Sequence, residues 1–217
     1  MSDPADRRPA TYQDVLDTPD HRVAEIISGE LRVSPRPGMP STAVASLLGA
    51  ELVTAFGRGR GGPGGWVIFD EPELHLGRDV LVPDVAGWHR SRLPAILETS
   101  FLTVAPDWVC EVLSPSTERT DRIEKLPIYA AHGIRHAWLV HPRRRTVEVF
   151  RLHEGNWLAV AVYKDDVKAR IEPFERALPK KPPSTVTFSG PHDTASLAQD
   201  ALDEIILGAS EPPAILP

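Results

Sequence analysis

A single acid inside an apolar run is the feature that most limits how this chain can fold. Glu111 is the only charged residue among residues 108–113, a segment with the length and composition of a buried strand. Taking an unpaired carboxylate out of water costs several kcal/mol. A fold tolerates such a group only when its pKa is raised, a cation or metal pairs with it, or the strand end faces a cleft. Glu111 therefore predicts a charged partner or a functional site.

Asp84 repeats this pattern in a second segment. It interrupts the apolar run 80–86 directly after Pro83. If the two strands are neighbours, Asp84 and Glu111 lie within a few ångströms, where two like charges need a cation between them. Each residue also has a purely structural interpretation, because Pro-Asp is a common turn element and a strand glutamate can pair with arginine or face solvent at an edge.

Lys125 is the candidate for that cation. It lies in a helix predicted over residues 118–132, with Thr117 as N-cap and Gly133 as C-terminal stop, and with a kink or a late start caused by Pro127. The alternative is an ordinary surface pair, because Asp121 and Lys125 have the favourable i, i+4 spacing, which contributes about 0.2–0.5 kcal/mol.

The remaining pattern predicts a mixed α/β domain (an α+β mixed sheet with flanking helices) that ends near residue 178. We expect a disordered N-terminus over 1–11, a domain over 12–178, and a Pro/Ser/Thr-rich tail over 179–217 with a helix at 195–207. The predicted elements are a hairpin of 23–27 and 31–34, a helix from Ser41 or Thr42 to Phe56, and strands at 66–69, 80–85, 108–113, 137–140, 146–152 and 157–163.

The segment 57–65 is rich in glycine and lacks the Gly-Lys-Ser/Thr ending of a phosphate-binding P-loop. It is interpreted as a mobile connection rather than a nucleotide site. The net charge of −6, from 24 Lys and Arg against 30 Asp and Glu, argues against a protein that grips nucleic acid through its whole surface.

The single cysteine allows no internal disulfide, and the N-terminus has no apolar signal region, so the cytoplasm is the expected location. The longest mostly apolar stretch, 42–56, is too short to span a bilayer and contains Glu51. No membrane role is expected.

Several short segments together resemble the Uma-type family, whose members are described as putative restriction endonucleases and were long catalogued as a domain of unknown function. The matching segments are 25–31, 34–37, 83–85, 111–117, Asp121 with Lys125 and Tyr129, Gly133, and 138–142. The resemblance covers about residues 12–176. It implies the restriction-endonuclease-like PD-(D/E)XK fold, in which metal binds at the end of the central strands.

The resemblance also implies residue roles. Asp84 and Glu111 take the places of the two acidic metal ligands for Mg²⁺ or Mn²⁺, and Lys125 matches the family's helix-borne lysine, whereas Leu113 stands two residues after the acid. Glu71 and Glu73 are further candidate ligands. The candidate phosphate contacts are Arg119, Arg122, Arg143, Arg144 and Arg145, for which a solvated helix face and hairpin turn is the alternative. The family often has a histidine where this chain has Ser41 and Thr42.

The leading hypothesis is a divalent-metal-dependent endonuclease that hydrolyses DNA phosphodiester bonds as a homodimer, since one such site cuts one strand. Two alternatives stay open. One is a catalytically silent module that binds nucleic acid or protein on the same fold, which the net charge of −6 favours. The other is a hydrolase of small phosphoesters, which needs no extended basic groove.

Overall fold

A computed structural model of the protein describes residues 8–93, 99–165, 168–169, 171–174 and 186–187. Its helices are α1 (Tyr12–Leu16), α2 (Met39–Leu52), α3 (Glu118–Thr120) and α4 (Leu126–Ala131), and π-helical turns at Val53–Gly57 and Asp121–Lys125 extend α2 and join α3 to α4. The strands are β1 (Arg22–Ile27), β2 (Glu30–Pro35), β3 (Trp66–Asp70), β4 (Leu74–Leu76), β5 (Asp79–Leu81), β6 (Val85–His89), β7 (Trp108–Val112), β8 (His136–His141), β9 (Thr146–His153), β10 (Asn156–Lys164), β11 (Lys168–Ala169) and β12 (Val186–Thr187).

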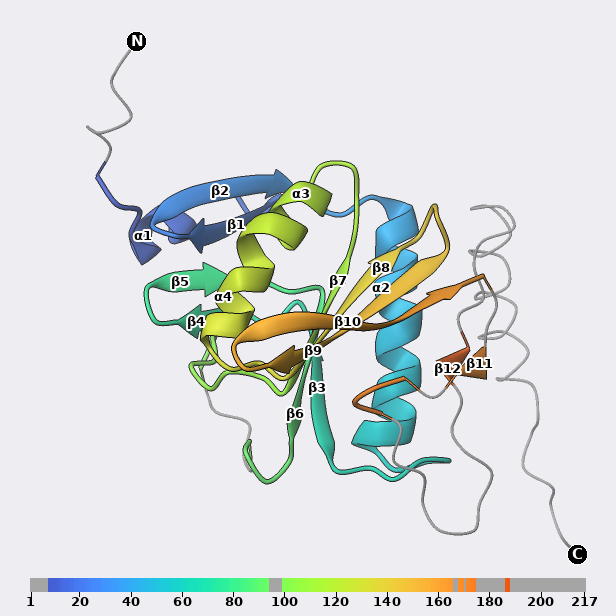
Figure 1. The fold of residues 1–217 in the computed structure, drawn as a ribbon. Helices are drawn as coiled ribbons and strands as arrows, with labels where there is room; N and C mark the ends of the chain where they lie inside the picture. The colour runs from blue at the N-terminus through green and yellow to red at the C-terminus, as the bar shows by residue number, and fades with distance from the viewer. Residues whose placement is uncertain (1–7, 94–98, 166–167, 170, 175–185, 188–217) are drawn as a thin grey trace, which may run out of the picture.

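Two sheets of different size build most of the fold, and β11 and β12 pair as a separate two-stranded sheet (Figure 1). The larger one has the strand order β10-β9-β8-β7-β6-β3, in which β7 and β8 are parallel and every other pair is antiparallel. The smaller one is antiparallel, with the order β2-β1-β5-β4. The predicted mixed sheet with flanking helices is confirmed.

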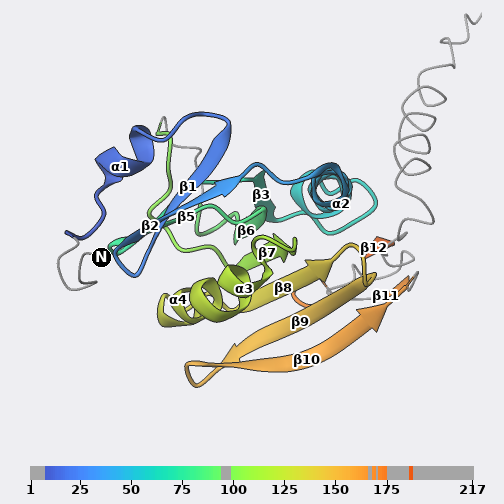
Figure 2. The same ribbon diagram turned by 90° about the horizontal axis from the view of Figure 1, so that it is seen from above.

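The large sheet is covered on both faces (Figure 2). Helix α2 packs on one face, where Leu48, Leu52 and Phe56 join the tryptophans of β3, β7 and β8. Helix α4 lies on the opposite face, and the small sheet shares that core, which includes Tyr129 and Leu81. Because β7 is buried on both faces, its continuous apolar run follows from its central position.

The predicted strand at 80–85 is wrong in one important respect. The chain forms two strands there, β5 in the small sheet and β6 in the large sheet. Pro83 has no N–H to donate to a ladder and falls in the break between them. Asp84 therefore stands where the chain crosses from one sheet to the other.

Helix α2 begins earlier than predicted. Gly38 is the N-cap, and its carbonyl accepts the N–H groups of Ser41 and Thr42, the two residues expected to cap the helix. Pro40 fits because the first turn needs no donor there and its fixed φ is already helical.

With its π-helical extension, Met39–Gly57 has 19 residues and a mean hydropathy of 1.3, which is long and apolar enough by composition to cross a membrane. The expectation that this stretch is too short to span a bilayer is therefore wrong by length. Its buried side chains pack against the large sheet.

The predicted helix at 118–132 is present as α3, a π-helical turn and α4. Gly133 has φ +71°, which confirms it as the stop. Thr117 precedes the helix but its side chain makes no capping bond. The sequence pattern did not predict α1 or β4, and the helix expected at 195–207 and residues 1–7 of the N-terminal segment lie outside the described residues.

A tight contact in β6 gives a test of this packing. A Cβ atom built on Gly87 would lie 3.2 Å from ring carbons of both Trp66 and Trp108. We expect Gly87→Ala to lower the free energy of unfolding by about 1–3 kcal/mol, because both rings would have to move. Urea unfolding followed by circular dichroism measures this change. Gly57→Ala is the control, since its nearest contact is an ordinary 3.6 Å, and equal loss in both variants would contradict the prediction.

Candidate active site

Asp84, directly before β6, lies opposite Glu111 on the neighbouring strand β7. Strands β6 and β7 pair antiparallel with Val85 opposite Cys110. One residue further, this register places Asp84 opposite Glu111, and residues opposite each other share a face of the sheet. The Val112 N–H donates to Asp84 Oδ2 at 2.6 Å and fixes that carboxylate against β7. Both acids therefore face the layer formed by α4 and the small sheet.

Glu111 is almost completely buried and is held through one oxygen. Its Oε1 accepts from Lys125 Nζ at 2.9 Å and from the Tyr129 hydroxyl at 2.5 Å. Burial raises the pKa of Glu111 well above its usual value, although Lys125 opposes the shift. The bonds recorded for Glu111 among the described residues all use Oε1, so Oε2 is available to a further ligand.

Lys125 is the centre of a buried ionic network. Its Nζ lies 3.0 Å from Glu25 Oε1 and 3.6 Å from Asp121 Oδ1, in addition to its contact with Glu111. Burial alone would lower the pKa of Lys125, but the carboxylates of Glu111 and Glu25 outweigh it, so the pKa lies well above its usual value. The lysine stays charged. The surface-pair interpretation of Asp121 and Lys125 is wrong, because both side chains are 5% exposed or less.

Glu25 and Asp121 are site residues that sequence reasoning missed. Glu25 Oε1 also accepts the Val82 N–H at 2.8 Å, so it ties the ends of β1 and β5 to the lysine. It is a lone acid in the apolar stretch 23–27, which is the signal that singled out Glu111. Asp121 faces inward because the π-helical turn Asp121–Lys125 buries its first and last residues. No sequence pattern indicated that turn.

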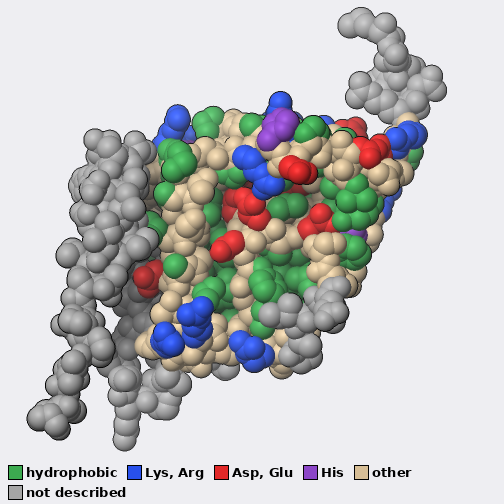
Figure 3. All heavy atoms as spheres, turned by 180° about the vertical axis from the view of Figure 1, so that it is seen from behind, with side chains coloured by type: hydrophobic (Ala, Val, Ile, Leu, Met, Phe, Trp, Pro, Cys, Tyr) green, Lys and Arg blue, Asp and Glu red, His purple; other side chains and the backbone are tan. Residues whose placement is uncertain are grey.

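A cleft of about 250 Å³ opens over these residues. Its acidic members are Glu25, Glu71, Asp84, Glu111 and Asp121, and its basic members are Arg36, Lys125 and Arg143. The walls come from the segments 34–41, 112–117 and 141–143. Figure 3 shows acidic side chains gathered in the middle of one face of the molecule. The cleft is therefore an acidic recess, which suits a cation better than a bare anion.

The two further candidate ligands are placed differently. Glu71 lines the cleft, donates its N–H to the Asp84 carbonyl at 3.0 Å, and pairs with Arg36 at 2.9 Å. Glu73 does not line the cleft, and its Oε1 lies 2.7 Å from His75 Nε2. The structure therefore brings Glu71 to Asp84 and Glu111, but not Glu73.

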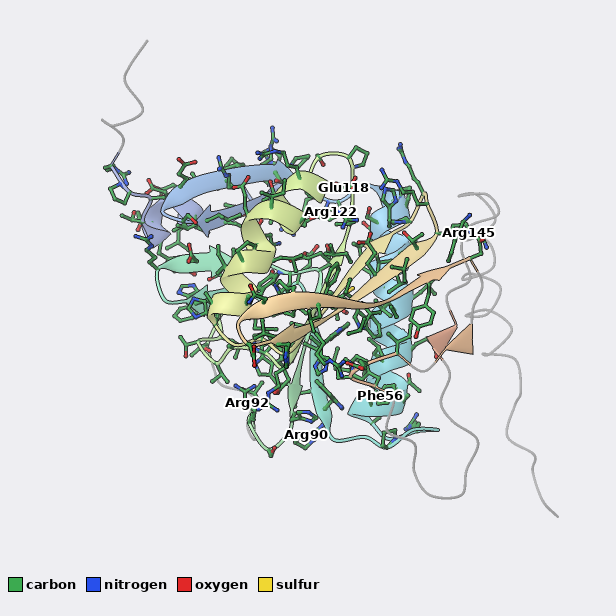
Figure 4. All side chains as sticks on the ribbon, in the orientation of Figure 1. Phe56, Arg90, Arg92, Glu118, Arg122 and Arg145 are labelled. Carbon is green, nitrogen blue, oxygen red and sulfur yellow. The ribbon has the colours of Figure 1, made fainter. Side chains whose placement is uncertain are left out.

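Most of the candidate phosphate-binding arginines are already paired with acids. Arg122 donates to both carboxylate oxygens of Glu148, and Figure 4 shows Arg122 beside Glu118, to which it also donates. The other pairs are Arg119 with Glu124, Arg144 with Glu118, and Arg145 with Asp165. Arg143 is exposed and lines the cleft. Of these five arginines, only Arg143 reaches the site.

Comparison with known families gives a match over most of the chain. The profile of the family Uma2, described as "Putative restriction endonuclease", matches residues 9–179. The chain belongs to the Uma2 family. The resemblance inferred from the short motifs is confirmed.

One similar solved structure supports the same fold for this Uma2 protein. It is a crystal structure titled as a putative nuclease belonging to DUF820 from Anabaena variabilis, with 24% sequence identity and a TM-score of 0.61. The alignment covers 78% of this chain and 94% of that one. The predicted restriction-endonuclease-like fold is confirmed. Comparison with curated proteins finds no match.

The donor set of the Uma2 site fits a hard divalent cation. Within the described ranges, no group of three or more His, Cys, Asp or Glu side chains is arranged to hold a metal. Asp84 and Glu111 remain as a facing pair of carboxylates. Mg²⁺ is typically bound through one or two carboxylates, with waters and substrate phosphates completing its shell, so two ligands suffice for it.

The excess of acids in the site predicts that removing one stabilises the fold. Burial raises the pKa of Asp84 from 3.8 to about 6, although its bond from Val112 opposes the shift. Ionising Asp84 above pH 6 therefore costs folding free energy, and below about pH 4 the group is protonated in both states and the cost disappears. We expect Asp84→Asn, unfolded in urea with EDTA present, to gain about 1–3 kcal/mol at pH 8 and almost nothing near pH 4.

Asp79→Asn is the matched control for that measurement. Asp79 is buried outside the cleft, and its Oδ1 accepts the Ser28 N–H at 2.6 Å, as Asp84 accepts the Val112 N–H. We expect it to gain no stability at either pH. A lower stability of Asp84→Asn than of the wild type at pH 8 would contradict the analysis.

Removing the positive charge of Lys125 should destabilise the fold. We expect Lys125→Met to lower the free energy of unfolding by about 3–5 kcal/mol, because Glu111 and Glu25 would be left as buried acids without their partner. The same urea experiment measures the loss. If Lys125→Met were as stable as the wild type, the lysine would not be what holds the acids together.

Proposed function

We propose that this protein is a divalent-metal-dependent endonuclease that hydrolyses DNA phosphodiester bonds. The observation that carries the proposal is the pair Asp84, directly before β6, and Glu111, on β7. Both line an open cleft, and a buried lysine contacts Glu111. Two acids at the ends of central strands with a helix-borne lysine are the constellation that the family resemblance implies for a PD-(D/E)XK nuclease. Membership of a family described as restriction endonucleases supports it.

Asp84 and Glu111 are the proposed ligands of Mg²⁺ or Mn²⁺. When bound, such an ion supplies neutralisation of the charge that develops on a phosphate and activation of water as a nucleophile. The chain contributes fixed ligand geometry. Asp84 is held by the Val112 N–H, and Glu111 is held by Tyr129 and Lys125, so neither carboxylate has to be ordered when the substrate arrives.

Lys125 acts in this proposal as a fixed positive charge. Its Nζ contacts Glu111, Glu25 and the Val82 carbonyl, which leaves it little freedom to move. A preorganised charge beside the reacting phosphate stabilises the transition state without reorganisation. At the rim, Arg36 and Arg143 can contact the same phosphate and orient it.

We further propose that the enzyme acts as a homodimer, because one such site cuts one strand and a double-strand break needs two. The cytoplasm remains the proposed location. One observation favours the small-phosphoester alternative, since a cleft of about 250 Å³, just below the roughly 300–1,000 Å³ of typical ligand pockets, holds only a small part of a substrate. One favours the silent binding module, since Lys125 satisfies Glu111 without a metal.

Plasmid nicking tests the proposal directly. We expect the wild type to convert supercoiled plasmid to open circles with Mg²⁺ or Mn²⁺ and to stop when EDTA is added. Asp84→Asn and Glu111→Gln should each abolish nicking because the proposed ligand set is lost. Asp79→Asn, a buried aspartate outside the cleft, should nick at the wild-type rate. Gel electrophoresis over time gives the rates.

The other outcomes identify the alternatives. If the wild type does not nick but still retards DNA in a gel, the silent binding module is correct. If it hydrolyses bis-p-nitrophenyl phosphate but neither nicks nor retards DNA, the small-phosphoester hydrolase is correct. Nicking that survives in Asp84→Asn would show that the cleft is not the site.

Metal binding is testable without activity. A ligand that binds only the folded state at a hundred times its Kd stabilises it by about 2.7 kcal/mol. We expect saturating Mn²⁺ to raise the Tm of the wild type and of Asp79→Asn, and to leave the Tm of Asp84→Asn unchanged. A similar rise in all three proteins would mean that Mn²⁺ binds elsewhere.

A further inference from the structure

Three exposed arginines lie together at the end of the molecule away from the cleft. Arg58 and Arg60 belong to the glycine-rich loop 57–65, and Arg90 follows β6. The Arg90 N–H donates to the Gly65 carbonyl at 2.8 Å, and its guanidinium donates to the carbonyls of Trp66 at 3.0 Å and Gly57 at 3.4 Å. The Arg90 head group is therefore fixed beside the residue that precedes Arg58.

The loop is packed rather than loose, which corrects the expectation of a mobile connection. The Arg60 N–H donates to the Thr54 carbonyl at 3.0 Å, and the Gly64 N–H donates to the Ala55 carbonyl at 3.1 Å. A Cβ atom on Gly62 would lie 2.5 Å from the Ala55 carbonyl oxygen, so only glycine allows this approach. These contacts hold the loop against the end of the helix and present its arginines from a defined backbone.

Within the part of the chain that the structure describes, no carboxylate neutralises the charges of this group. Arg58, Arg60 and Arg90 form no ion pair with any carboxylate of the described residues. By contrast, the arginines that pair with acids include Arg32, Arg36, Arg92, Arg119, Arg122, Arg144, Arg145 and Arg151. A protein with a net charge of −6 thus keeps a patch of uncompensated positive charge at one end. Figure 3 shows Lys and Arg side chains gathered along the lower edge of the face that carries the acidic recess.

This patch and the cleft lie at opposite ends of the same two strands. Strand β3 runs from Trp66, next to the loop, to Asp70, next to the cleft residue Glu71. Four steps at about 3.4 Å per residue separate those ends by roughly 14 Å. Figure 4 agrees, with Arg90 at the lower end of the molecule and Glu118 and Arg122 near the upper end.

An aromatic ring accompanies the arginines. His89 is exposed, and its ring centroid lies 4.1 Å from that of the buried Trp66. The two rings are tilted by 37°, and the exposed imidazole precedes Arg90 directly in the chain. Guanidinium groups next to an exposed ring are the combination that binds a phosphate backbone and its bases.

We propose that Arg58, Arg60 and Arg90, presented by the loop 57–65 and flanked by His89, form an exosite that binds the phosphate backbone of nucleic acid outside the cleft. The inference rests on the proposed function in taking nucleic acid as the substrate. The acidic cleft then supplies the chemistry, while the exosite supplies the electrostatic binding that the paired arginines near the cleft do not.

The experiment measures DNA binding in EDTA, where cleavage does not interfere. The probe is a fluorescein-labelled DNA duplex of two helical turns, followed by anisotropy across a series of salt concentrations. The variant is the triple substitution Arg58→Gln, Arg60→Gln and Arg90→Gln. The matched control is Arg119→Gln, Arg144→Gln and Arg151→Gln, which removes the same charge from exposed arginines that are paired with acids.

We expect the exosite triple variant to bind at least tenfold more weakly, and the slope of log K against log salt to become shallower by about 2 to 3, because up to three phosphate contacts are lost. The control triple variant should stay within twofold of the wild type. Wild-type affinity and slope in the exosite variant would overturn the proposal. An equal loss in the control variant would do so too, because it would reduce the effect to net charge. Thermal melts check that both variants are folded.

Kinetics separate this proposal from the proposed function. On plasmid, the exosite variant should show a raised KM with kcat retained, whereas on bis-p-nitrophenyl phosphate, which is too short to reach 14 Å, it should match the wild type. A wild type that does not nick while the exosite variant loses affinity would refute the nuclease and leave the exosite standing. Normal nicking by the exosite variant with an unchanged KM would refute only the exosite.

Discussion

The ammonium group of Lys125, buried among the carboxylates of Glu111, Glu25 and Asp121, is the contact on which the site depends. It joins the central strand β7, strand β1 of the small sheet and the π-helical turn before α4 at one point. With Asp84 close by, acids outnumber the cation, so the arrangement is short of positive charge. A buried ion pair is usually poor evidence for stability. Here the ion pair matters for geometry, because it fixes the Glu111 carboxylate at the cleft. The remaining negative charge favours binding of a further cation.

Much of the site could be predicted from the sequence because burial makes a lone acid conspicuous. Glu111 and Asp84 stand out in apolar strands, and their strands are indeed neighbours on the sheet. Glu25 carries the same signal, but the pattern of its segment is equally well explained by a simple hairpin strand. The sequence predicts Lys125 as the partner of these acids, but its i, i+4 spacing from Asp121 is equally compatible with a surface pair. Only the π-helical turn decides, because it buries both side chains.

The parts of the fold that escaped prediction depend on contacts between distant segments. Pro83 marks a break, but whether the chain turns or changes sheets there is decided by the packing of β5 and β6. The arginines also depend on contacts between distant segments that the sequence does not reveal. A run such as residues 143–145 is basic in sequence, yet Glu118 and Asp165 compensate two of its three charges in space. A count of charges along the chain therefore predicts basic surface at residues 143–145, where nearby acids compensate most of the charge.

Tyr129 and Glu25 have a consequence for when this protein can become active. The site draws on residues from Glu25 to Arg143 and from both sheets, so no shorter fragment of the emerging chain contains all of it. A ribosome releases Glu25 long before the helix that carries Lys125 has been made. For the proposed nuclease, the cleft can therefore be complete only after residues of both sheets have been synthesised and the two sheets have docked.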